Sequence, residues 1–350
     1  MDPLKVVREN ILRMAGYVPG EQPRGGKVIK LNTNENPYPP SPRVLEAIRS
    51  SLDESLRLYP QPTADDLREK AAEVYGLPPE CIIAGNGSDE LLTMLVRVFV
   101  GEGEKVVYPT PTYTLYETLA EIQGGGTVEV PFPSDFSLPA GLAESEGKVL
   151  FLANPNSPSG TLVPTDQVRR LAESFRGIVV VDEAYADFAG ETSIPLVRDL
   201  ENVVVLRTFS KSFSLAGIRL GLAFGNPGVI EQMMKVKDSY NVNRLTQVAG
   251  IAALEDLEWM KENVRKVVRT RERMTEKLKE MGFTVLPSRA NFVFARREGE
   301  YLKNLYEGLK ERGILVRFFD TPSLRDALRI TVGTDEEVDL FLEELASLLK

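Results

Sequence analysis

The sequence predicts an α/β protein with a parallel sheet, on the basis of three apolar runs and of the residues that follow them. The runs are 149–153, 178–181 and 203–206. The last of them is too short for a free helix and is rich in β-branched side chains, as is typical of a buried parallel strand. Ligands of open α/β sheets bind outside the carboxyl ends of the strands, so we expect a functional site at that edge.

Polar residues follow each of these runs, namely Asn154, Asp182 and Lys211. Taken alone, Lys211 also fits an ordinary solvated surface lysine. Because parallel strands end at the same edge, however, we expect all three side chains at one end of the sheet. A partly buried carboxylate there is costly unless a cation pairs with it. A lysine held as an imine and an aspartate facing a protonated pyridine nitrogen form the arrangement that pyridoxal phosphate (PLP) enzymes use.

The segments 154–160, 182–185 and 210–219 resemble signature segments of the fold-type-I PLP-dependent aminotransferases, in particular the histidinol-phosphate aminotransferases. The order and spacing of the motifs match from about residue 15 to the C-terminus. The resemblance implies a large domain with a mostly parallel seven-stranded sheet between helices, plus a smaller α+β C-terminal domain. Ser157 and Ser159 depart from the common pattern, which has Asn and Thr there. Both residues suit a turn, so we expect the loop to keep its form.

Composition excludes several classes of function. The net charge is −9 and the pI about 5.0, which argues against binding nucleic acid or an anionic membrane. The chain has no histidine, which excludes a Ser-His-Asp triad and a His-ligated metal, so acid–base chemistry falls to Lys, Tyr, Asp or Glu. A single cysteine, Cys81, allows no intrachain disulfide, and we expect no metal site. No apolar stretch suggests a membrane span or signal peptide, so we expect a cytoplasmic enzyme.

The first 30 residues are expected to form an arm that packs away from the first core, followed by a large domain, 31–250, and a small domain, 251–350. A helix is predicted from Asp2 to Gly16. Tyr17 is either an arm anchor or, as the resemblance implies, a contact to the substrate phosphate. The turn-forming segment 30–37 resembles the segment that lines the substrate pocket, with Asn34 and Glu35 facing it.

Helices are predicted from Ser41 to about residue 56 and from Thr63 to Gly76. Tyr59, between them, would be a packing residue by itself. The resemblance instead implies a homodimer in which Tyr59 reaches the cofactor phosphate of the partner subunit.

A short strand, 81–84, enters the turn 85–90 and then an apolar helix, 91–100. A glycine-rich turn that opens a helix points free N–H groups and a positive dipole end at an anion. The residues alone leave a simple tight turn equally possible. By resemblance, the PLP phosphate is cradled by Gly87, Ser88 and Asp89 and is also bound by Ser210 and Arg219.

The resemblance assigns the remaining cofactor contacts. Tyr113, which follows the strand 106–108, stacks on the pyridine ring. Asn154 and Tyr185 hydrogen-bond to the 3′-oxygen, and Asp182 keeps the ring nitrogen protonated. Lys211 holds PLP covalently and then moves the proton of the substrate.

The C-terminal third begins with a long helix from about residue 251 to Met281, ended by Gly282. Strands are predicted at 283–286, 291–295, 314–317 and 328–332, with helices at 301–311 and after a Thr334–Glu337 capping box. This part supplies Asn291, Arg317 and Arg329. By itself, an arginine at the start of a strand is also typical of a surface ion pair. By resemblance, Arg329 instead grips a carboxylate of glutamate or the phosphate of histidinol phosphate, and Arg317 is a second anion contact.

The resulting hypothesis is a PLP-dependent aminotransferase that moves an amino group between L-histidinol phosphate and 2-oxoglutarate. An aromatic-amino-acid aminotransferase or a threonine-phosphate decarboxylase of the same fold would use the same core residues. A PLP-binding relative without turnover is a further alternative, against which the full residue set argues. A nucleotide-binding α/β protein that uses the loop 85–89 is the remaining one.

Overall fold

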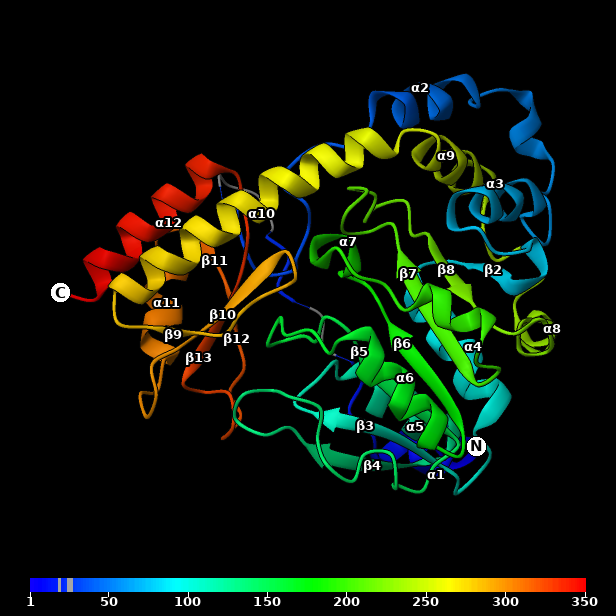
Figure 1. The fold of residues 1–350 in the computed structure, drawn as a ribbon, viewed down its shortest axis with the longest axis horizontal. Coiled ribbons are helices and arrows are strands. Elements are labelled where there is room, and N and C mark those ends of the chain that lie inside the picture. The colour runs from blue at the N-terminus through cyan, green and yellow to red at the C-terminus, as the bar shows by residue number, and fades with distance from the viewer. Residues whose placement is uncertain (18–19, 24–27) are drawn as a thin grey trace.

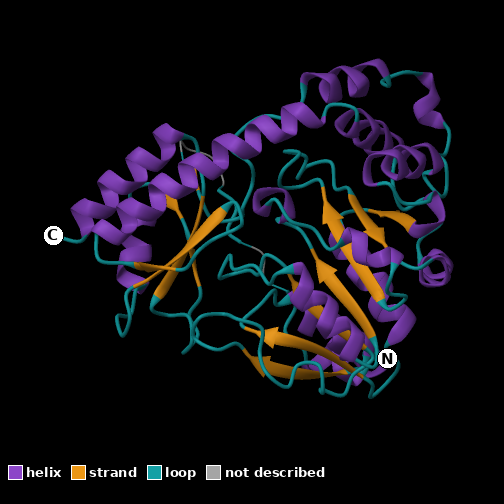
Figure 2. Ribbon diagram, in the orientation of Figure 1, coloured by secondary structure: helices purple, strands orange, loops and turns teal. Residues whose placement is uncertain are grey.

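A computed structural model describes residues 1–17, 20–23 and 28–350. It contains a large sheet and a smaller one, and the long helix α10 (Leu257–Glu280) runs from beside the large sheet across the small one (Figure 1). Strands of both sheets are flanked by helices (Figure 2). The arrangement confirms the predicted α/β fold with a second, smaller α+β part.

The large sheet has seven strands in the order β2-β8-β7-β6-β5-β3-β4. Its strands are β2 (Ile82–Gly85), β3 (Lys105–Thr110), β4 (Gly126–Pro131), β5 (Val149–Ala153), β6 (Ile178–Asp182), β7 (Val203–Thr208) and β8 (Gly221–Phe224). Strand β8 pairs antiparallel with both neighbours, and the other pairs are parallel. The three apolar runs are the adjacent strands β5, β6 and β7, so their carboxyl ends meet at one edge as predicted.

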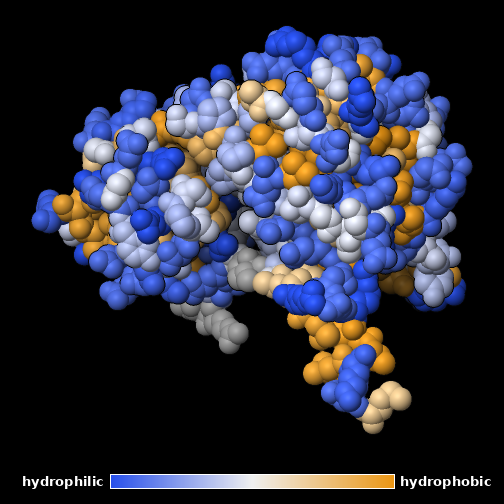
Figure 3. Space-filling view, turned by 90° about the horizontal axis from the view of Figure 1, so that it is seen from below, coloured by the Kyte–Doolittle hydropathy of each residue, from blue (hydrophilic) through white to orange (hydrophobic). Residues whose placement is uncertain are grey.

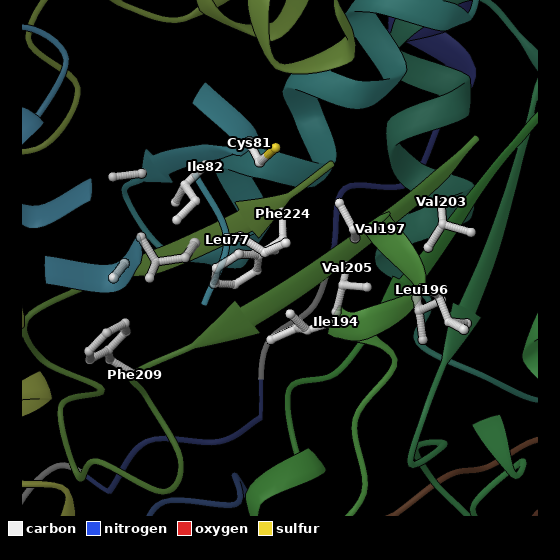
Figure 4. Close-up of a cluster of buried hydrophobic side chains, with 14 of the residues drawn as sticks. Leu77, Cys81, Ile82, Ile194, Leu196, Val197, Val203, Val205, Phe209 and Phe224 are labelled. Atoms are coloured by element: carbon white, nitrogen blue, oxygen red, sulfur yellow. The ribbon is translucent and has the colours of Figure 1, made fainter. Parts of the chain in front are cut away.

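Both faces of this sheet are covered, which explains why its central strands are apolar throughout. Val203 and Val205 of β7 belong to a core on one face, whereas Val204 and Leu206 belong to the core on the other. Figure 4 shows part of the first core, in which Cys81 is buried beside Ile82. Helices α2 (Pro42–Ser50), α3 (Asp65–Tyr75), α6 (Thr165–Ser174) and α9 (Arg244–Leu254) cover that face. Helices α4 (Ser88–Phe99), α5 (Leu115–Gln123) and α8 (Pro227–Val236) cover the other.

The small sheet is antiparallel, with the order β12-β13-β10-β9. Its strands are β9 (Thr284–Val285), β10 (Phe292–Arg296), β12 (Arg317–Phe318) and β13 (Ala327–Thr331). Side chains of α10, α11 (Lys303–Glu311) and α12 (Asp335–Leu348) join its core. The predicted capping box at the start of α12 is present. A parallel pair of β1 (Ile29–Lys30) and β11 (Ile314–Leu315) brings Leu31 into the same core.

Several predicted element boundaries are wrong. The helix from Ser41 ends at Ser50, and Asp53 then caps a separate 3-10 turn, η2 (Glu54–Arg57). The long C-terminal helix is interrupted at residues 255–256, so α10 begins only at Leu257. The strand 314–317 divides in two because residues 314–315 pair with β1, whereas residues 317–318 pair with β13. Short pieces complete the chain, namely α7 (Ala186–Ala189), η3 (Pro79–Cys81) and η4 (Ile194–Arg198).

The N-terminal helix is shorter than predicted and consists of η1 (Pro3–Val6) and α1 (Glu9–Arg13). Neither piece buries a residue, so there is no tertiary packing that would stabilise a longer helix. The side chain of Asn10 donates to the carbonyl of Glu121 on α5, which anchors α1. The start of the chain projects from the body and carries apolar side chains (Figure 3). None of the described helices has the length and apolar character needed to cross a membrane.

Replacing Leu95 with alanine tests the packing on the second face of the large sheet. Leu95 of α4 is fully buried, so truncation removes apolar contacts and leaves a cavity. We expect a loss of about 2–5 kcal/mol in the free energy of unfolding, measured by urea denaturation. The control is Leu340→Ala on α12, where half of the side chain is exposed and the expected change is within about 0.5 kcal/mol. Equal losses in the two variants would contradict this assignment of the core.

Candidate active site

A cavity of about 300 Å³ lies at the carboxyl edge of β5, β6 and β7, where the small sheet faces it. It is lined by residues from both sheets and from the segment between β1 and α2. The predicted site residues that line it are Tyr17, Asn34, Glu35, Ser88, Asp89, Tyr113, Asp182, Tyr185, Ser210, Lys211, Arg219, Arg317 and Arg329. Side chains from widely separated parts of the sequence are therefore brought to one site.

Lys211 lies in the turn that follows β7 and is held from two sides. Its Nζ donates to the carbonyl of Thr33 at 3.2 Å, and its own carbonyl accepts from the side chain of Asn36 at 3.0 Å. Burial lowers the pKa of Lys211 to about 8, and the nearby Arg329 acts in the same direction. A larger fraction of this amine is therefore neutral at physiological pH than of an ordinary lysine, which suits a nucleophile or a general base.

Asp182 ends β6, and its side chain is buried. Its Oδ2 accepts from the hydroxyl of Tyr116 at 2.9 Å, whereas its Oδ1 has no hydrogen-bond partner among the described residues. Burial raises the pKa of Asp182 to about 6, although the Tyr116 hydrogen bond opposes the rise. An unsatisfied buried carboxylate oxygen is costly, so this oxygen is suited to a ligand that brings a donor. A protonated pyridine nitrogen is such a donor.

The first turn of α4 and the loop after β7 together form a candidate anion site. Gly87 precedes the helix with φ of +84°, and a Cβ there would lie 2.4 Å from Nη2 of Arg219. Arg219 approaches this turn closely and donates through Nη1 to Ser210 Oγ at 3.2 Å. Its Nη2 lies 3.4 Å from Oδ2 of Asp89. A helix N-terminus, a hydroxyl and a guanidinium together suit a phosphate group.

Gly221, a residue that the sequence analysis did not single out, allows the same close packing. A Cβ at this position would lie 2.6 Å from the backbone nitrogen of Ser88. Only glycine therefore lets β8 pass directly beside the anion site. The recurrence of glycine at positions 217, 221 and 225 was a signal that could have identified it.

A second candidate anion site lies on the small sheet. Arg317 and Arg329 are directly opposite each other in the antiparallel pair of β12 and β13. Like charges in this position repel, and the aromatic ring of Phe319 lies beside both guanidinium groups. Arg329 donates to Ser157 Oγ at 2.9 Å and to the carbonyl of Asn32 at 3.0 Å, while its buried Nε has no described partner. An anionic substrate group would relieve the repulsion.

Tyrosines and amides form the remaining walls of the cavity. Tyr113 donates to Asp89 Oδ1 at 3.2 Å and meets the ring of Tyr17 edge-on, with centroids 5.9 Å apart. The hydroxyl of Tyr185 accepts from Asn34 Nδ2 at 2.9 Å. Burial acts to raise the pKa of Glu35, but hydrogen bonds from Lys30 and Thr33 outweigh it and lower that pKa. Glu35 is therefore an ionised group at the cavity wall.

Four predicted site residues do not line the cavity. Gly87 lies directly behind it, as described above. The side chain of Asn154 is buried. Its Oδ1 accepts from the backbone N–H of Val163 at 2.8 Å, and its Nδ2 donates to the carbonyl of Val163 at 2.9 Å. Asn291 is also buried and donates to the carbonyl of Asn34, so it supports a cavity residue. Tyr59 is largely exposed and stacks on Tyr240, away from the cavity of its own chain.

A buried ionic network supports the site from behind, and sequence reasoning missed it. Arg207 of β7 contacts Glu183, at 3.1 Å, and Asp187. Asp187 also accepts from the hydroxyl of Ser212. Glu183 and Ser212 directly follow Asp182 and Lys211, so the network joins the two turns that carry these residues. The signal in the sequence was a lone arginine at the end of an apolar strand, because a buried arginine requires acidic partners.

Comparison with known proteins identifies the class. The family model described as aminotransferase class I and II matches residues 26–345, and the chain belongs to this family. The chain is also 47% identical to histidinol-phosphate aminotransferase 1 of Trichormus variabilis over 345 residues, which cover 98% of this chain and 99% of the relative. Within the family, it is a member of the histidinol-phosphate aminotransferases.

Solved structures support the same fold. The crystal structure of histidinol-phosphate aminotransferase from Sinorhizobium meliloti in complex with pyridoxal-5'-phosphate is 30% identical, with a TM-score of 0.85 and 91% of each chain covered. An L-threonine-O-3-phosphate decarboxylase from Porphyromonas gingivalis has a TM-score of 0.82 at 22% identity and covers 92% of this chain and 99% of its own. The latter likeness concerns the fold alone.

Replacing Asp182 with asparagine is expected to stabilise the cofactor-free protein at neutral pH. A raised pKa in the folded state means that the stability contributed by Asp182 is present below its unfolded pKa of 3.8 and is lost as the pH rises through about 6. Asparagine has no charge to bury and avoids that loss. We expect a gain of roughly 1–3 kcal/mol near pH 7.5 and almost none near pH 4, measured by urea unfolding over a pH series.

The control for this variant is Asp238→Asn, at an exposed aspartate. It should leave stability nearly unchanged at every pH. An Asp182→Asn protein whose advantage over the wild type did not grow between about pH 4 and about pH 7 would contradict the raised pKa.

Replacing Arg207 with methionine tests the ionic network. The variant leaves Glu183 and Asp187 without their buried cation, so we expect a loss of about 3–5 kcal/mol in the free energy of unfolding. Arg169→Met is the matched control, because Arg169 forms an ion pair with Asp199 at the surface and should contribute at most about 1 kcal/mol. Urea denaturation at neutral pH measures both. Equal stability of the two arginine variants would contradict a stabilising role of the buried network.

Proposed function

We propose that the chain binds PLP in this cavity, attached through Lys211. The free Oδ1 of Asp182 and the anion site at the start of α4 support the fit. Asp182 would receive the ring nitrogen, and the phosphate would be held by Gly87, Ser88, Asp89, Ser210 and Arg219. Bound in this way, the cofactor supplies an electron sink for the substrate carbon that loses a proton.

Different residues of the chain then have different roles in transamination. The ionised carboxylate of Asp182 keeps the ring nitrogen protonated. Lys211, once the substrate amine has displaced it, would take the proton from the amine-bearing carbon of the substrate and donate it again as a general acid–base. A pKa of about 8 suits a group that must both accept and donate this proton near neutral pH. Asn154 and Tyr185 are assigned to the 3′-oxygen, and Tyr113 to the face of the ring.

The opposed pair of Arg317 and Arg329 carries the substrate proposal. The reaction is the transfer of an amino group between L-histidinol phosphate and 2-oxoglutarate, giving imidazole acetol phosphate and glutamate, as a step of histidine biosynthesis. Both substrates bring an anionic end, a phosphate in one case and a carboxylate in the other, and two arginines can receive either. Tyr17, Asn34 and Glu35 are assigned to the rest of the substrate, and Asn291 to the support of Asn34.

A homodimer is part of the same proposal. Tyr59 and Tyr240 form an exposed stack, and Leu52, Leu56 and Leu58 nearby in the sequence are also exposed. An exposed apolar group of this kind is suited to a second copy of the chain. In that assembly Tyr59 would reach the cofactor phosphate of the partner subunit. The division into an arm, 1–30, a large domain, 31–250, and a small domain, 251–350, stays a prediction, as does a cytoplasmic location.

Lys211→Ala is the variant that tests the catalytic assignment. It removes the amine that attaches the cofactor and moves the proton, so transamination of L-histidinol phosphate with 2-oxoglutarate should fall to background, measured as glutamate formed. Lys148→Ala, at a surface lysine paired with Glu104, is the control and should retain wild-type turnover. Substantial turnover by the Lys211 variant would overturn the role of this residue.

The same assay separates the proposed reaction from its relatives. The wild type is supplied in turn with L-histidinol phosphate, an aromatic amino acid and O-phosphothreonine, and the products are identified. Glutamate formed fastest from histidinol phosphate supports the proposal. Preference for the aromatic amino acid, or release of carbon dioxide from O-phosphothreonine, would replace it with an aromatic aminotransferase or a decarboxylase of the same fold.

A further inference from the structure

Tyr116 lies directly behind the cavity and does not line it. Its side chain, on α5, is fully buried. The ring stacks on Phe151 of β5, with centroids 4.8 Å apart and an interplanar angle of 11°. It also meets the ring of Tyr113 edge-on, with centroids 5.6 Å apart. Contacts on two sides therefore fix the ring, and with it the direction of the hydroxyl.

That hydroxyl determines how Asp182 presents its two oxygens. It donates to Oδ2 at 2.9 Å, and Tyr116 is the one side chain among the described residues that donates to Asp182. The bond restricts rotation of the carboxylate and leaves Oδ1 as the oxygen with no partner in the described part of the chain. An acceptor held in one orientation by a buried donor is preorganised for a ligand, because no further ordering is needed when the ligand binds.

The same bond favours the ionised form of Asp182. Burial, together with the charges of Asp89 and Glu183, disfavours a negative charge at this position. The hydrogen bond from Tyr116 and one from the backbone of Ala184 act in the opposite direction. Without the Tyr116 hydroxyl, a neutral carboxyl would be favoured further, and a neutral carboxyl cannot keep a pyridine nitrogen protonated.

We propose that Tyr116 is a positioning residue for the reaction, which holds Asp182 ionised with Oδ1 turned toward the ring nitrogen of PLP. This inference rests on the proposed function, because it concerns the same cofactor. Tyr116 touches neither cofactor nor substrate and acts through Asp182. Its edge-on contact with Tyr113 also joins Tyr116 to the residue assigned to the face of the ring.

Tyr116→Phe tests the proposal, since phenylalanine keeps the ring stacked on Phe151 and removes only the hydroxyl. The matched control is Tyr108→Phe on β3. Tyr108 is buried, its ring centroid lies 6.1 Å from that of Tyr116, and its hydroxyl has no hydrogen-bond partner among the described residues. Both variants lose one buried hydroxyl from neighbouring rings, but only one of these hydroxyls contacts Asp182.

The first measurement is the ¹⁵N NMR shift of PLP labelled at the ring nitrogen and bound to each protein. In Tyr116→Phe we expect the signal to move toward that of a neutral pyridine, whereas Tyr108→Phe should match the wild type. The second is the dissociation constant of PLP, which should rise by about tenfold to hundredfold in Tyr116→Phe, the range for a lost hydrogen bond to a charged group. The value of kcat should fall by a similar factor, with KM for the amine changed far less.

The outcomes are distinguishable. A shift confined to Tyr116→Phe supports the positioning role. An unchanged ¹⁵N signal in Tyr116→Phe, or an equal shift in Tyr108→Phe, overturns it while leaving PLP binding and the proposed function in place. A wild-type protein that binds no PLP overturns both.

Discussion

The structure depends on the burial of two ionisable groups at the carboxyl edge of a parallel sheet. Asp182 ends β6 and Lys211 follows the adjacent strand β7, in a sheet with a packed core on each face, so neither group is fully solvated. Burial moves the pKa of the carboxyl up to about 6 and that of the amine down to about 8. Each group is thereby driven toward neutrality, and each is stabilised by a partner that a bound cofactor would provide.

Much of the surrounding structure holds these two turns in place. The network of Arg207, Glu183, Asp187 and Ser212 joins them from behind. Asn36, in the segment between β1 and α2, donates to the carbonyl of Lys211. Asn34 is itself fixed by Thr331 of the small sheet, through hydrogen bonds of 2.9 and 3.0 Å. The segment between β1 and α2 is thus bonded both to the small sheet and to the Lys211 turn. Movement of one sheet relative to the other would alter the cavity directly.

The local pattern of the sequence predicted those features that depend on short segments. Three apolar runs predicted adjacent buried strands, and the polar residues after them predicted the edge at which Asp182 and Lys211 meet. The family resemblance then extended the prediction to most residues of the cavity wall. The Thr334 capping box was likewise a local signal, and it is present.

Features that depend on contacts between distant segments could not be predicted in this way. The hydrogen bond between Tyr116 and Asp182 joins residues 66 positions apart, and nothing in either segment indicates it. The opposition of Arg317 and Arg329 depends on strand register, which was obscured because the predicted strand 314–317 pairs with two different partners. Asn291 was expected to contact the substrate. It instead lies behind the cavity wall, where its amide donates to the carbonyl of Asn34.

The visible absorbance spectrum of the purified protein, before and after addition of L-histidinol phosphate, tests the central claim most directly. The account predicts an absorption band of Lys211-bound PLP that is lost on addition of the amine, as the cofactor takes up the amino group. A band that does not respond to histidinol phosphate would leave the cofactor site intact and contradict the substrate. The absence of any band, even after PLP is supplied, would contradict the claim that Asp182 and Lys211 form a PLP site.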